Sequence, residues 1–318
     1  MRIIIAAATL GLGFAASAAS AQNLGNVGIA TSNPGSLFHN IGTAVANAAN
    51  EGGLNATIQP ATSPNQYLPF VNSGGIDFGV ANLQEVSYGV TGEAWWNGVQ
   101  NPNIRVVGML MPLVEAVFVR ADSGIRSLDD LVGHPITYGY TAQNTILPQY
   151  DAIFATAGLT ADQFEHVSVP SVVGGVDAFM AGEADAFIFA HGAGKVREAD
   201  AAVGGLLALP VGSSDEAALE AAREHWPTAS FEELKAGSMP GVTEDATYIA
   251  FPQVVFTHAD VPDEVVYQMT KAMYENAQLM AETFPPFKAF NPDKMKGDPG
   301  VAEFHPGALK FYDEVGLE

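Results

Sequence analysis

Residues 27–40 read VGIATSNPGSLFHN, and this stretch decides the fold class. It joins a strand-like apolar run to a turn of small polar residues. A helical pattern follows, in which apolar side chains recur from Leu37 to Ala48. The glycine pair at 52–53 ends that helix, and residues 56–59 read as a second strand. This succession predicts a mostly parallel sheet flanked by helices.

The same order of features returns later in the chain. Residues 136–138 read as a strand, GYTAQNT (139–145) as a turn, and residues 146–157 as a helix. SGGIDFGVAN (73–82) and AGEADAFIFA (181–190) also resemble each other, since each has a glycine that ends a helix, then an aspartate and a buried strand. We therefore expect two similar α/β lobes, connected by apolar strand-like runs.

The first residues have the pattern of a secretory signal peptide. A positive charge at Arg2 precedes an apolar run and an Ala-x-Ala site, which places cleavage after about Ala21. The apolar run is too short to span a bilayer well. We expect a soluble mature protein in the periplasm. The chain has no cysteine, which excludes disulfides, thiolate nucleophiles and cysteine-ligated metals.

The charge balance limits the partners. The formal net charge is −22, with 13 basic against 35 acidic residues. Nucleic-acid binding depends on phosphate neutralisation by Lys and Arg, so we expect no nucleic-acid partner. The acidic residues are spread along the chain, which also speaks against a dedicated cation site.

Each turn, one per expected lobe, follows a strand and starts a helix. Ligands of such sheets bind beyond the carboxyl ends of the strands, where helix N-termini suit a small anion. Ser36, Asn144 and Thr145 would add side-chain donors, although they can equally act only as helix caps. Neither turn contains Lys or Arg, so we expect a monocarboxylate or a zwitterion rather than a dianion.

The sequence offers little support for catalysis. It lacks a phosphate loop with its lysine and a GxGxxG turn after a strand. The seven histidines have no metal-binding spacing, and Ser36 lacks the GxSxG turn of a nucleophile. We predict no enzyme, no cofactor and no metal. An exported hydrolase that uses Ser36 is the alternative.

Two further features leave their roles open. Glu115 interrupts an apolar run, where an unpaired buried charge would be costly. We favour a structural ion pair with Arg120 or Arg126, and contact with the cleft is the alternative. For Trp95 and Trp96 we favour packing of one ring over an aromatic wall for the ligand.

Several motifs in order resemble the TAXI-type solute receptors of tripartite ATP-independent periplasmic (TRAP) transporters. They are GSLF (35–38), DFGVAN (77–82), DSGIRSLDDLVG (122–133) and HPGA (305–308), and the resemblance runs from about Val27 to the C-terminus. It implies a two-lobed periplasmic binding protein of type II fold, each lobe a mixed, mostly parallel sheet flanked by helices. Lobe I would comprise residues 22–113 and 251–318, and lobe II residues 114–250.

The resemblance also implies a function. A monomer would close around a small organic acid or amino acid and then dock on a sodium-coupled TRAP permease; an ABC importer or a sensor kinase is the alternative partner. The residues expected to bind the ligand are Asn33, Gly35, Ser36, Leu37, Phe38, Asn82, Gln84, Glu115, Tyr140, Gln143, Asn144, Thr145, His191 and Gly192. Side-chain amides stand in both turns where relatives have glycines, so we expect a narrower pocket and a different selectivity.

Overall fold

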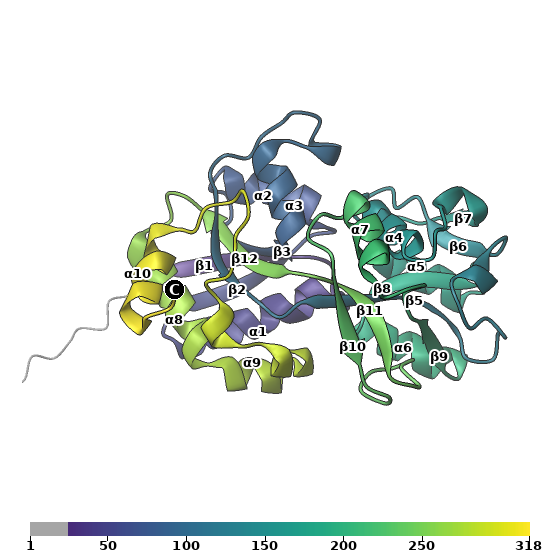
Figure 1. Ribbon diagram of the computed structural model, residues 1–318. Helices are drawn as coiled ribbons and strands as arrows, with labels where there is room; N and C mark the ends of the chain where they lie inside the picture. Colours follow the sequence, from purple (N-terminus) through teal and green to yellow (C-terminus); the bar gives the residue numbers. More distant parts are fainter. Residues whose placement is uncertain (1–24) are drawn as a thin grey trace, which may run out of the picture.

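The computed structural model describes residues 25–318, so the predicted signal peptide lies outside the described residues. The described part forms two α/β lobes side by side, each built on its own sheet (Figure 1). The two-lobed fold expected from the sequence is confirmed. No helix within residues 25–318 is long and apolar enough to cross a membrane.

The first lobe has a five-stranded sheet in the order β2-β1-β3-β12-β4. Its strands are β1 (Asn26–Thr31), β2 (Asn55–Pro60), β3 (Phe78–Asn82), β4 (Ile104–Met109) and β12 (Gln253–His258). The accompanying helices are α1 (Leu37–Glu51), α2 (Pro64–Asn72), α3 (Leu83–Thr91), α8 (Asp263–Glu275), α9 (Ala277–Thr283) and α10 (Pro306–Val315), with the short 3₁₀ turns η1 (Ala94–Trp96), η4 (Pro285–Ala289) and η5 (Pro292–Lys294).

The second lobe has a seven-stranded sheet in the order β10-β11-β5-β8-β6-β7, and β9 also pairs with β5. Its strands are β5 (Leu113–Arg120), β6 (Pro135–Tyr138), β7 (Glu165–Ser168), β8 (Ala186–Ala190), β9 (Leu206–Leu209), β10 (Ser230–Leu234) and β11 (Ala246–Phe251). The accompanying helices are α4 (Ile146–Ala155), α5 (Val172–Met180), α6 (Gly194–Val203) and α7 (Glu216–His225), with the 3₁₀ turns η2 (Asp129–Leu131) and η3 (Ala161–Gln163).

Both sheets are mixed, as expected, but the expectation that they are mostly parallel is wrong, because parallel pairing is restricted to three strands in each sheet. β2-β1-β3 and β7-β6-β8 are parallel, whereas β12 and β5 pair antiparallel with their neighbours. Both of these strands begin directly after a crossing between the sheets, β5 after residues 110–112 and β12 after Pro252. Pro252 therefore divides what reads in the sequence as one apolar run, 248–256, into two strands of different sheets.

The HPGA motif near the C-terminus docks the last helix. His305 caps α10, because its Nδ1 accepts the Gly307 N–H at 3.1 Å while Nε2 faces the Ala259 carbonyl at 3.2 Å. A Cβ on Gly307 would lie 2.2 Å from the Asp263 carbonyl oxygen, so only glycine lets α10 approach α8. At the other side, the Tyr312 hydroxyl donates to the Val107 carbonyl at 2.6 Å. The motif is thus explained by packing in lobe I.

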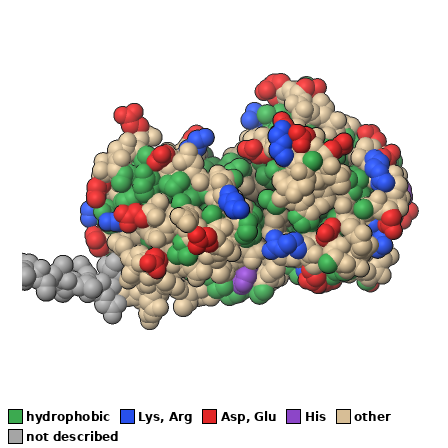
Figure 2. All heavy atoms as spheres, turned by 90° about the horizontal axis from the view of Figure 1, so that it is seen from below, with side chains coloured by type: hydrophobic (Ala, Val, Ile, Leu, Met, Phe, Trp, Pro, Cys, Tyr) green, Lys and Arg blue, Asp and Glu red, His purple; other side chains and the backbone are tan. Residues whose placement is uncertain are grey.

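The surface agrees with the spread of charge in the sequence. Figure 2 shows acidic side chains scattered over both ends of the molecule, with no single acidic patch on that face. The outline of the molecule in this view is indented at its upper edge between the two lobes (Figure 2).

Candidate functional site

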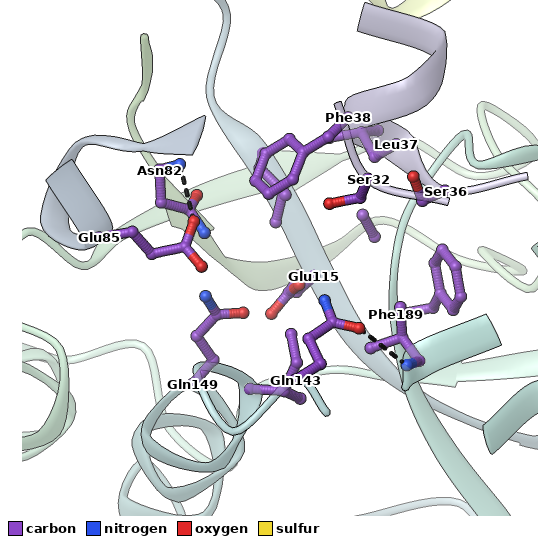
Figure 3. Close-up of a pocket in the computed structure, with 14 residues that line it drawn as sticks. Ser32, Ser36, Leu37, Phe38, Asn82, Glu85, Glu115, Gln143, Gln149 and Phe189 are labelled. Atoms are coloured by element: carbon purple, nitrogen blue, oxygen red, sulfur yellow. Dashed lines mark hydrogen bonds between the residues drawn. The ribbon is translucent and has the colours of Figure 1, made fainter. Parts of the chain in front are cut away.

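A cavity lies where the two lobes meet, and both contribute to its walls (Figure 3). It holds about 390 Å³ of space not filled by atoms, its open mouth included. Its lining residues are Ser32, Ser36, Leu37, Phe38, Asn82 and Glu85 from lobe I, and Leu113, Glu115, Gln143, Ile146, Gln149, Val172, Phe189 and Ala190 from the other side.

The junction of β3 and α3 places Asn82 and Glu85. Asn82 ends the strand and caps the helix, in a capping box whose second member is Glu85. The Asn82 N–H donates to Glu85 Oε2 at 3.0 Å. Both residues are 2% exposed. The cap therefore holds a carboxyl group inside the molecule, and Figure 3 shows that it points into the cavity.

Strand β5 places the second carboxyl group. Glu115 is 4% exposed and lies between Ile249 of β11 and Ala190 of β8 in the sheet. The favoured ion pair with an arginine is wrong. Arg120 pairs instead with Asp122 at 3.2 Å, and the Arg126 guanidinium donates to backbone carbonyls. Glu115 faces the cavity because β5 leads directly from the crossing between the lobes.

Gln149 connects the two lobes through this polar wall. With its amide nitrogen toward Glu115, it donates to both carboxyl oxygens, at 3.2 and 3.0 Å, and its oxygen accepts from Asn82 Nδ2 at 2.9 Å. This orientation satisfies both neighbours, which is how amide orientations are assigned. Gln253 donates to the Asn82 side-chain oxygen from β12. Asn82, Gln149 and Glu115 thus form one chain of hydrogen bonds across the cleft.

Burial changes the acidity of both carboxyl groups. It raises the pKa of Glu85 to about 7, although the Asn82 N–H and the Thr145 hydroxyl act in the opposite direction. Burial also raises the pKa of Glu115 to about 8, and the charge of Glu85 adds to that rise. The two carboxyl groups therefore interact electrostatically across the cavity. No basic side chain stands among the described residues that line it.

The first turn contributes as expected in part. Ser36, Leu37 and Phe38 line the cavity, and the Ser36 hydroxyl accepts the His39 N–H at 3.2 Å as the cap of α1. The N–H groups of Leu37 and Phe38, in the first turn of α1, have no acceptor within the helix. Ser32 also lines the cavity, and its buried hydroxyl has no hydrogen-bond partner.

The second turn, residues 139–145, has fewer free backbone N–H groups than the sequence suggests. Three of its N–H groups already donate to backbone carbonyls: Thr141 to Val169, Ala142 to Pro170 and Gln143 to Tyr140. The first two N–H groups of α4 do the same, Ile146 to Gln143 and Leu147 to Asn144. Gln143 does line the cavity, but its side-chain oxygen accepts the Val172 N–H at 3.1 Å. This turn therefore offers an anion fewer free donors than expected.

Eight of the expected residues do not line the cavity. Asn144 is exposed, Gln84 and Thr145 are buried beside the lining, and Tyr140 bonds to Thr137 through its hydroxyl. The others are Asn33, Gly35, His191 and Gly192. His191 is 4% exposed, packs against the rings of Phe118 and Tyr248, and has a pKa lowered to about 3 by burial.

Sequence reasoning missed the polar partners of this site. Glu85 could have been found, because Asn82 and Glu85 have the spacing of a capping box at the end of a buried strand. Gln149 has no such signal, since only the docking of α4 against the other lobe gives it a role. The remaining missed lining residues are Ser32, Leu113, Ile146, Val172, Phe189 and Ala190.

Direct contacts close the cleft around the cavity. The Ser63 hydroxyl, before α2, donates to the Ala142 carbonyl at 3.1 Å. On the other side, the Lys195 N–H of α6 donates to the Gly35 carbonyl at 3.3 Å. These bonds describe a closed arrangement of the lobes, in which Gly35 serves as an inter-lobe contact.

An aromatic cluster adds a third contact. Trp95 of lobe I stacks on Trp226 of lobe II, with ring centroids 6.5 Å apart and an interplanar angle of 20°. Tyr88 meets the same indole edge to face at 6.3 Å. Neither Trp95 nor Trp226 lines the cavity, and Trp96 does not line it either. The packing interpretation of Trp95 thus accounts for its position, and the cluster joins the lobes.

The chain matches the NMT1-like family over residues 29–316, nearly its whole length. Solved structures share its fold. The periplasmic binding protein BugD is 10% identical, with a TM-score of 0.58 over 92% of this chain and 98% of that one. A putative sulfonate-binding protein from Methylobacillus flagellatus is 13% identical, with a TM-score of 0.50 over 93% and 96%. A binding protein of an ABC phosphonate transporter from Pseudomonas aeruginosa is 9% identical, with a TM-score of 0.50 over 82% and 78%. At these identities the likeness concerns the fold.

Proposed function

We propose that this chain, which belongs to the NMT1-like family, is a periplasmic solute-binding receptor that captures a small organic acid or amino acid between its lobes. The observation that carries the proposal is the cavity between the two sheets, whose walls come from both lobes. A ligand that touches both lobes favours the closed state over the open one. The lobe bounds of 22–113 with 251–318, and of 114–250, belong to this proposal.

The site in this proposal holds a ligand without transforming it. Ser36, the candidate nucleophile of the hydrolase alternative, caps α1 through its hydroxyl. Histidine is absent from the described residues that line the cavity. We expect no turnover of ester or amide probes by the purified protein. Turnover that Ser36→Ala abolishes would favour the hydrolase instead.

Ligand binding is tested by thermal unfolding of the purified, signal-free protein with a library of small acids and amino acids. A ligand bound only by the folded protein at about 100 times its Kd stabilises it by about 2.7 kcal/mol. Tryptophan fluorescence is a second readout, since two of the three tryptophans stack across the closing lobes. A library that changes neither signal contradicts the receptor function.

The proposed membrane partner is a sodium-coupled TRAP permease, and the receptor is proposed to act as a monomer after removal of its signal peptide. The TAXI-like motifs support this partner, whereas two of the structural neighbours are described as binding proteins of ABC transporters. Ligand uptake into vesicles that carry a permease encoded beside this gene distinguishes a TRAP permease from an ABC importer. Uptake that needs this protein and a sodium gradient supports the proposal, and uptake driven only by ATP favours an ABC importer. Light scattering of the purified protein tests the monomer.

A further inference from the structure

The charges that line the cavity point to one chemical class of ligand. Glu85 and Glu115 bring two carboxyl groups into it, and none of the described lining residues is Lys, Arg or His. We propose that the ligand carries a protonated amino group on a small apolar body, and that the carboxyl groups of Glu85 and Glu115 bind this amino group. The inference rests on the proposed receptor function and selects amines and amino acids over plain organic acids.

The hydrogen bonds already present favour a donor as the occupant. Both carboxyl groups accept from N–H groups of the protein, Glu85 from Asn82 at 3.0 Å and Glu115 from Gln149 at 3.0 and 3.2 Å. An ionised carboxylate has about four lone-pair positions, so acceptor capacity remains on both. An ammonium group brings three donors and no acceptor. An ammonium group in the cavity would donate to the remaining acceptor positions of Glu85 and Glu115. Its positive charge would stabilise the ionised form of these two buried carboxyl groups.

Two buried hydroxyl groups lie at this place. Ser32, which lines the cavity, is 2% exposed, and its Oγ has no hydrogen-bond partner. Thr145 is 1% exposed, and its hydroxyl lies close enough to Glu85 to lower the pKa of that carboxyl group. Buried polar groups are rarely left unsatisfied. A donor in the cavity gives Ser32 a partner and a third point of attachment.

The rest of the lining is apolar. Phe38 and Phe189 line the cavity from opposite lobes, as Figure 3 shows. Aromatic faces attract organic cations, an effect that strengthens when water is excluded. The aliphatic lining side chains are Leu37, Leu113, Ile146 and Val172. They suit a hydrocarbon body. Any ligand carboxylate would be placed at the free N–H groups that begin α1.

The acidity of the pair links binding to protons. Burial holds the pKa values of Glu85 and Glu115 at about 7 and 8, so both groups keep protons in weakly acid solution. The other titratable groups near them are phenols, Tyr67 beside Glu85 and Tyr140 and Tyr150 beside Glu115, and burial raises the pKa values of all three. An ammonium group favours the ionised carboxylates. Binding should therefore release protons and strengthen from pH 6 to pH 8.

The experiment compares three probe sets with matched side chains, by calorimetry on the purified signal-free protein. One set consists of amino acids, one of the same acids with hydrogen in place of the amino group, and one of the amines with hydrogen in place of the carboxylate. We expect amino acids or amines to bind, and the acids without nitrogen to bind roughly 10- to 100-fold more weakly or not at all. Equal or tighter binding of those acids overturns the inference but leaves the receptor function intact. If no probe of the three sets binds, both the inference and the proposed receptor function are overturned.

Variants connect the preference to the two carboxyl groups. Glu85→Gln and Glu115→Gln should each weaken binding of the best amine-containing probe by roughly 10- to 100-fold. The matched control, Glu183→Gln at an exposed position outside the cavity lining, should not weaken it. Circular dichroism verifies folding. For wild type, calorimetry in buffers of different ionisation enthalpy should show proton release at pH 7. Unchanged affinity in both glutamine variants, or binding without proton release, contradicts the inference.

Discussion

Replacing Glu115 by glutamine should stabilise the ligand-free protein in alkaline solution. Burial and the nearby charge of Glu85 raise the pKa of Glu115 to about 8, from its ordinary value of 4.5. The folded protein therefore holds a proton that the unfolded chain loses near pH 4.5. Stability is fully present below that value and is lost as the pH rises through 8, because ionisation then occurs inside the protein. Glutamine keeps the shape and one acceptor oxygen for the Gln149 amide, but it cannot ionise.

The size of the effect follows from the difference in acidity. Each pKa unit corresponds to about 1.4 kcal/mol, so the ionised group costs on the order of a few kcal/mol at pH 9. In a protein of this size, that cost corresponds to a melting temperature lower by roughly 5–10 °C. Glu85 contributes in the same direction, since burial raises its pKa to about 7.

Scanning calorimetry from pH 5 to pH 9 measures this. The melting temperature of Glu115→Gln should exceed that of wild type at pH 9, and the difference should shrink toward pH 5. Glu183→Gln, at an exposed position, removes one negative charge from the surface and separates general repulsion in this acidic protein from the buried group. Equal slopes for wild type and Glu115→Gln would refute the assignment of a buried, proton-holding carboxyl group.

Three other changes test closure of the lobes by their effect on the Kd of the best probe. Gly192→Ala should weaken binding more than Gly182→Ala. Both glycines have φ near +80°, but only at Gly192 would a Cβ meet a proline ring of lobe I, at a distance of 2.7 Å. Equal affinities of the two variants would contradict a contact between the lobes at Gly192. Ser63→Ala removes a bond between the lobes worth about 0.5–1.5 kcal/mol and should raise the Kd several-fold, whereas Ser73→Ala, at the end of the same helix, should leave it unchanged. Trp95→Phe should raise the Kd and reduce the fluorescence change on binding, since it replaces a stacked indole; an unchanged signal would place closure elsewhere.

Much of the fold can be predicted from local patterns. Apolar periodicity and glycine positions indicate α1, α4 and both strand–turn–helix units, because these features depend on residues near in sequence. The division at Pro252 and the break between α8 and α9 at Asn276 do not follow from hydropathy, which continues through both points. They depend on which sheet each segment joins.

The candidate site is harder to predict because its partners come from distant segments. Six of the fourteen expected residues line the cavity, namely Ser36, Leu37, Phe38, Asn82, Glu115 and Gln143. The two turns of small polar residues, each at the start of a helix, led us to expect an anion bound by helix N-termini. The carboxyl group of Glu85 and the amide of Gln149, which give the cavity its character, become neighbours only when the lobes pack. Whether any of these residues binds ligand stays a prediction.

The position of β12 has a consequence for how the chain is made. β12 lies between β3 and β4 in the first sheet, yet it follows them in sequence with the whole second lobe in between. As the polypeptide emerges from its N-terminus, β3 and β4 cannot complete their pairing, and their edges stay open until residues 253–258 arrive. The second lobe, contained in one continuous segment, can finish first. A chain built in this order stays incompletely folded until most of it has been synthesised, which would suit the export across a membrane that we propose for it.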